Sequence, residues 1–73
     1  MPEMSDPAEA DAARLRRFFH DLATPLSAVS LHLERASRLM ARGEDPEDAL
    51  STARQQLDRA FDLLAHGREE LLR

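Results

Sequence analysis

His20, Asp21 and Thr24 are the residues whose types and spacing could do chemistry together. One nitrogen of a neutral imidazole can attack phosphorus while a carboxylate holds the proton on the other nitrogen. Asp21, the next residue along the chain, is the candidate for that carboxylate. Thr24 follows His20 by four residues, which places it one turn away on the same face of a helix. These three residues therefore predict a catalytic group built on a nucleophilic histidine, provided that they lie on one helix.

Two segments carry the residues that start a helix. Asp6-Pro7-Ala8-Glu9 and Asp45-Pro46-Glu47-Asp48 each offer a capping carboxylate, a proline at the first helical position and acids in the first turn. Gly43 can adopt the left-handed conformation that closes a helix. We therefore predict a disordered segment 1–6, a helix over 7–42, a loop over 43–45 and a helix over 46–72.

Both predicted helices carry an uninterrupted heptad pattern. In the first helix, spacings of four and three residues alternate through Leu15, Phe19, Leu22, Leu26, Val29, Leu33, Ala36 and Met40. In the second helix they run through Leu50, Ala53, Leu57, Ala60, Leu64, Gly67 and Leu71, and the stripe is widened by Phe61, Leu63 and Leu72. The short connection makes the helices fold back as an antiparallel hairpin. One hairpin leaves much of both stripes in water, so we predict an all-α homodimer in which two hairpins form a four-helix bundle.

Charge and composition narrow the classes of function. The 73 residues carry a net charge of -4, with acids and bases interspersed, and contain no cysteine. This balance disfavours nucleic acid as a partner. Every apolar run is too short to cross a bilayer, and the first residues lack the order of a signal peptide. We therefore expect a cytoplasmic chain, or the cytoplasmic part of a membrane-bound parent, without direct membrane contact.

Pro25 departs from the pattern of the first helix. It lies inside the helix without disturbing the heptad, where it should kink the backbone and leave the Asp21 carbonyl without its amide partner. The usual cost of an interior proline is about 3 kcal/mol. A residue that is unfavourable for its local structure, in a sequence that is otherwise consistent with that structure, often marks a functional site.

The segment that contains this proline, HDLATPL from His20 to Leu26, resembles the phosphoacceptor box of sensor histidine kinases. The pattern of that box is His, an acid, Leu, any residue, Thr or Asn, Pro and Leu. Residues 59–68, RAFDLLAHGR, resemble the second helix of the same family, which typically carries an Arg before an apolar Asp-Leu-Leu segment. The resemblance covers about Leu15 to Leu72 and implies a dimerisation and histidine phosphotransfer domain.

The resemblance also implies roles and partners for this chain. His20 would accept a phosphoryl group through the ATP-binding domain of a histidine kinase and pass it to an Asp of a response-regulator receiver domain. Thr24 would hydrogen-bond a water or the phosphoryl group during dephosphorylation of the regulator. With Phe19 at heptad position a, His20 falls at b and faces solvent, as a nucleophile that meets two large partners requires.

Two positions depart from the family pattern. Ala23 stands where a basic residue is common, so any contact of that residue with an ATP-binding domain or a phosphoryl group is missing. Phe19 replaces the small polar residue that often precedes the histidine. Both departures leave the acceptor itself in place.

A stripe of residues below His20 is the predicted contact for the receiver domain. It continues from Thr24 through Ser27, Leu31 and Arg35. Leu31 falls at position f, where a plain coiled coil would place a charge. Of the other aromatic and imidazole side chains, we expect Phe19 and Phe61 in the core and Phe18 at the boundary between helices. His32 and His66 should be solvated or rim residues.

Nothing in the sequence resembles a nucleotide site, since the chain has only two glycines and no Gly-rich loop. We therefore expect no cofactor in this chain, with ATP and Mg²⁺ supplied through a separate ATP-binding domain and no activity on ATP by the chain alone. No spacing of His and carboxylates completes a metal site. The helical register that continues to Arg73 favours a fragment of a kinase over a free-standing phosphotransfer protein. The alternative class is a purely structural hairpin, an oligomerisation or adaptor module in which His20 has no role.

Overall fold

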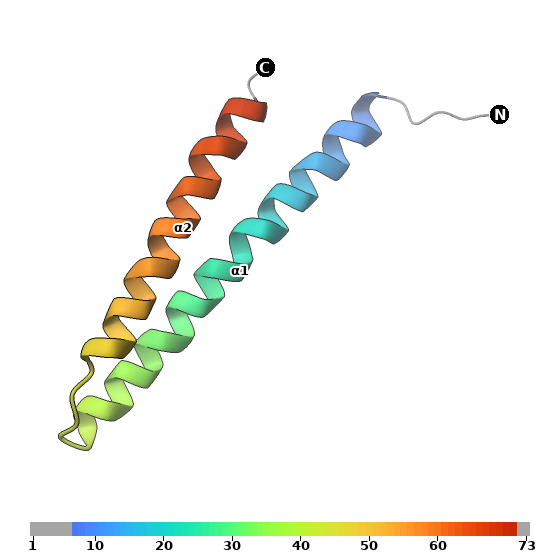
Figure 1. The fold of residues 1–73 in the computed structure, drawn as a ribbon. Helices are drawn as coiled ribbons and strands as arrows, with labels where there is room; N and C mark the ends of the chain where they lie inside the picture. Colours follow the sequence, from blue (N-terminus) through green and yellow to red (C-terminus); the bar gives the residue numbers. More distant parts are fainter. Residues whose placement is uncertain (1–6, 72–73) are drawn as a thin grey trace.

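The computed structural model describes residues 7–71, which form two helices and no strand. Helix α1 spans Pro7–Ala41 and helix α2 spans Glu47–Leu71, and they run antiparallel as a hairpin 63 Å long (Figure 1). The prediction of an all-α chain with two helices is confirmed. The predicted cap Asp6, the predicted disorder of residues 1–6 and the end of the second helix at Leu72 lie outside the described residues.

The loop between the helices closes α1 with the predicted glycine. Gly43 has a φ of 74°, and its amide donates to the Met40 carbonyl at 3.0 Å. The Glu44 amide donates to the Leu39 carbonyl at 2.8 Å, so the two bonds form a Schellman motif. Arg42 is the capping residue of this motif, which is why α1 ends at Ala41, one residue before the predicted boundary.

Asp45 caps the start of α2. Its Oδ1 accepts a hydrogen bond from the Glu47 amide at 3.0 Å, the bond expected when Pro46 occupies the first helical position. The observed helix begins at Glu47, one residue after the predicted start. The predicted capping chemistry is therefore present, and Pro46 lies at the boundary, where its carbonyl accepts a hydrogen bond from the Leu50 amide at 2.9 Å.

Substituting the capping carboxylate should destabilise the hairpin. Asp45→Ala removes the only side-chain acceptor that the described chain offers to the Glu47 amide, which should cost about 1 kcal/mol of unfolding free energy. Thermal unfolding at a fixed chain concentration would measure the loss. Asp45→Asn keeps an acceptor oxygen and is the matched control, so equal losses in both variants would contradict a capping role.

Small residues fill the space between the two helices. Within the described chain the buried residues are Pro25 and four alanines, namely Ala36, Ala49, Ala53 and Ala60. Short side chains let two helix axes approach closely, but each buries little apolar area. The interior of one hairpin is therefore narrow and contributes limited stabilisation.

Large apolar side chains lie on the outside of the hairpin. Ten are exposed, namely Leu15, Phe19, Leu26, Leu31, Leu33, Met40, Leu50, Leu57, Phe61 and Leu64. All but Leu31 and Phe61 belong to the predicted heptad stripes, and Phe61 widens the second stripe. Phe19 and Phe61 are each 59% exposed, so neither lies in the interior of a single hairpin. Neither described helix contains a segment apolar enough to span a membrane.

The helices separate toward their far ends (Figure 1). Phe18 of α1 lies against Gly67 of α2, near the point where the helices diverge. In this antiparallel register the first two turns of α1 extend past the described end of α2, and residues 7–12 are all exposed. The amino-terminal end of α1 therefore has no helical neighbour within the described chain.

Candidate functional site

His20 is exposed on α1, and the helix continues through Pro25. The Pro25 ring is fully buried, so it packs into the hairpin interior and does not end the helix. The Thr24 hydroxyl donates to the His20 carbonyl at 3.5 Å, which places both residues on one face. The predicted kink at Pro25 stays a prediction, whereas the accessibility of the His20 ring is observed.

Asp21 points into a different environment from His20. Its side chain lines two cavities between the helices, and within residues 7–71 no hydrogen bond joins its carboxylate to the His20 ring. Adjacent residues on a helix differ by 100° in direction, so they do not face one another. The role of Asp21 in holding the imidazole proton stays a prediction, and it requires the carboxylate to turn toward His20.

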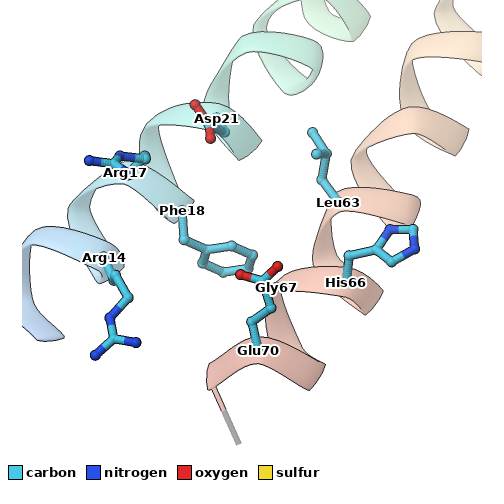
Figure 2. A pocket seen from close by; sticks show the side chains of 8 residues that line it. All are labelled: Arg14, Arg17, Phe18, Asp21, Leu63, His66, Gly67 and Glu70. Atoms are coloured by element: carbon cyan, nitrogen blue, oxygen red, sulfur yellow. The ribbon is translucent and has the colours of Figure 1, made fainter. Parts of the chain in front are cut away.

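The larger cavity, about 290 Å³, opens where the helices separate (Figure 2). Its lining residues come from both helices: Arg14, Arg17, Phe18, Asp21, Leu63, His66, Gly67 and Glu70. Phe18 reaches across to α2, and a Cβ on Gly67 would overlap the Phe18 ring. A helical glycine costs about 1 kcal/mol relative to alanine, and here its missing side chain makes room for the ring. Phe18 therefore packs between the helices, as its predicted boundary position suggested.

The second cavity, about 270 Å³, brings the site residues of α1 next to an arginine of α2. Asp21, Thr24 and Pro25 line one side, and Arg59 and Leu63 line the other. In the sequence, Arg59 belongs to the segment that resembles the second helix of the family, without a predicted role of its own. Counting 12 residues outward from the loop in both helices pairs Arg59 with Val29, which is one turn away from Pro25, so the sequence alone locates this neighbour only approximately.

The remaining predicted residues fall in two environments. Ser27, Leu31 and Arg35 are all exposed, and Leu31 is 60% exposed, so they are accessible to a partner. His66 is exposed at the edge of the larger cavity, as expected. His32 is half-buried, and its Nδ1 is buried without a hydrogen-bond partner in the described chain.

No group of three or more His, Asp and Glu side chains within residues 7–71 is placed to hold a metal ion. No protein-family model, curated protein or solved structure matches the chain.

Proposed function

We propose that the chain is the dimerisation and phosphoacceptor domain of a sensor histidine kinase, with His20 as the acceptor. The observation that supports this best is the exposed His20 ring, one turn from Thr24 on the same face and followed by a proline buried in the hairpin. A structural hairpin explains the apolar stripes, but it gives no reason for an interior proline or for the residue order before it.

The proposed reaction has two transfers. In the first, a His20 ring nitrogen attacks the γ-phosphorus of ATP held by a separate domain, so an N–P bond forms and the O–P bond to ADP breaks. The electron pair of that bond stays with ADP, and Asp21 holds the proton on the other ring nitrogen. In the second, a carboxylate oxygen of the receiver domain attacks the same phosphorus, and the ring leaves as neutral imidazole.

The proposed assembly is a homodimer that forms a four-helix bundle. The exposed stripes of the two helices support this proposal, because monomeric proteins rarely expose a long apolar surface. A second copy related by a twofold axis presents the same stripes, so each copy can cover the other. His20 follows Phe19 by one residue and so points about 100° away from that stripe, which leaves it accessible in such a dimer.

The test of this function is phosphorylation of the purified chain. ATP alone should leave it unlabelled, whereas ATP with an ATP-binding domain of its own kinase, or a phosphorylated cognate regulator, should label it. The product should be a phosphoramidate, which is labile in acid and stable in base, unlike a phosphoserine or phosphothreonine. Absence of label with both donors would favour the structural alternative.

The receiver domain should dock over the stripe below His20. Leu31→Glu adds a charge to an apolar side chain that a bound receiver would cover, so transfer to the cognate regulator should fall by about tenfold, the equivalent of 1.4 kcal/mol. Rapid-quench measurement of transfer would test this. Ser30→Glu, an exposed neighbour outside the stripe, is the control, and unchanged transfer in Leu31→Glu would place the docking surface elsewhere.

A further inference from the structure

Arg59 lies across the hairpin from the proposed acceptor. Its side chain lines the second cavity together with Asp21 and Thr24. Thr24 is one turn from His20 on the same face of α1, and its hydroxyl reaches the His20 carbonyl. His20 does not line this cavity itself, and Thr24, one turn further along the same face, connects the His20 ring to the edge of the cavity that Arg59 helps to form.

The Arg59 guanidinium is not engaged elsewhere in the described chain. The ion pairs that the arginines of residues 7–71 form involve Arg14, Arg38 and Arg42, and no hydrogen bond reaches Arg59. The side chain is also exposed, so an anion can approach it without displacing a buried contact. An unpaired guanidinium offers a planar set of donors that matches the oxygens of a phosphoryl group.

The acceptor turn of α1 has no positive charge of its own. Residues 20–26 contain neither lysine nor arginine, and the nearest arginines of α1, Arg16 and Arg17, lie one turn before His20. A phosphoryl group brings close to two negative charges at neutral pH, next to the carboxylate of Asp21. Each cation that reaches the phosphoryl group reduces the repulsion between those charges and the attacking carboxylate of a receiver domain.

We propose that Arg59 of α2 binds the phosphoryl group carried by His20 of α1 and stabilises its charge during transfer to the receiver carboxylate. This inference rests on the proposed function of His20. The second helix thus contributes a cation directly to the site. The stabilisation by Arg59 should be largest in the transition state, where the transferred group lies between the imidazole and the receiver carboxylate.

Two measurements on the full chain test the role of Arg59. The chain is first phosphorylated on His20 with phosphoramidate, a small donor that needs no protein partner, and transfer to the cognate receiver is then followed in a single turnover. Arg59→Ala should slow this transfer by at least about tenfold. Arg59→Lys keeps the charge but loses the planar arrangement of donors, so its transfer rate should lie between those of Arg59→Ala and the unsubstituted chain. Arg54→Ala is the matched control, because Arg54 is an exposed arginine of α2 that lines neither cavity.

The second measurement is the pH titration of the phosphoryl group by ³¹P NMR, which needs no receiver. A neighbouring guanidinium favours the dianion, so Arg59→Ala should move the titration midpoint to higher pH and Arg54→Ala should leave it in place. Equal transfer rates and equal midpoints in Arg59→Ala and the unsubstituted chain would overturn the inference while leaving the function of His20 intact. Failure of the unsubstituted chain to be labelled at His20 would instead overturn the proposed function.

Discussion

Replacing His20 with alanine should abolish phosphorylation of the chain. The imidazole is the proposed nucleophile, and the other two histidines of the chain, His32 and His66, lie elsewhere. Loss of an exposed side chain away from the buried alanines should change the unfolding free energy by less than about 0.5 kcal/mol. Labelling with radioactive phosphate, together with circular dichroism of the same sample, would separate lost chemistry from lost folding.

His32→Ala and His66→Ala are the matched controls for this experiment. His32 is half-buried, with its Nδ1 atom buried, and His66 lies at the edge of the larger cavity, so neither shares the exposed face of His20 and Thr24. Both variants should keep the full label. A label that survives in His20→Ala would contradict the proposed function and favour a purely structural hairpin.

Introducing a charge into the exposed apolar stripe should dissociate the dimer. Phe61→Glu places a carboxylate where a 59% exposed phenyl ring is proposed to meet the second copy, and each dimer contains the change twice. We expect the dissociation constant to rise at least about 100-fold, the equivalent of 2.7 kcal/mol. Helicity should fall with it, because little of a single hairpin is buried.

Light scattering and circular dichroism over a dilution series would measure both effects. For the unsubstituted chain, mass and helicity should fall together on dilution. Leu31→Glu is the control: Leu31 is equally exposed but lies two residues before Leu33, so it points about 200° away from the stripe. A well-folded monomer at every concentration would contradict the four-helix bundle.

The loop and the helices could be predicted from the sequence because their signals are local. Gly43 and Asp45 each act within a few residues, and the structure places both in the expected roles. The periodicity of 3.5 residues likewise depends only on the chain itself. The predicted end of α1 and the predicted start of α2 each differ from the structure by one residue, Arg42 and Pro46. Both are residues at a helix terminus, where the boundary is least well defined.

It was harder to predict which residues of each apolar stripe pack against the other helix of the hairpin and which stay exposed. The heptad placed Ala36 and Leu33 in one stripe, yet in the hairpin Ala36 is buried and Leu33 is exposed. The pattern reports which residues avoid water, and it does not report which helix covers each of them. The same limit applies to Phe18, whose contact with Gly67 depends on the separation of the helices.

The candidate site could be predicted from the sequence where its residues lie on one helix, but not where they lie on two. His20 and Thr24 are related by one turn, and the structure places them on one face. Arg59 follows His20 by 39 residues along the chain, and only the register of the hairpin brings it near Thr24. Spacing along one helix therefore predicts neighbours within a turn, whereas a cross-helix neighbour requires the fold.

The alanine-lined interior has a consequence for cells that contain several related hairpins. Four buried alanines can pack in much the same way in many sequences, so they carry little information about which chains pair. The bulky side chains on the outer stripes differ in shape, and in a dimer they would meet their counterparts on the partner. Selection for the proposed pairing with its own copy would then act on the leucines and phenylalanines of these stripes, leaving the exposed face of His20 free to diverge with the proposed regulator.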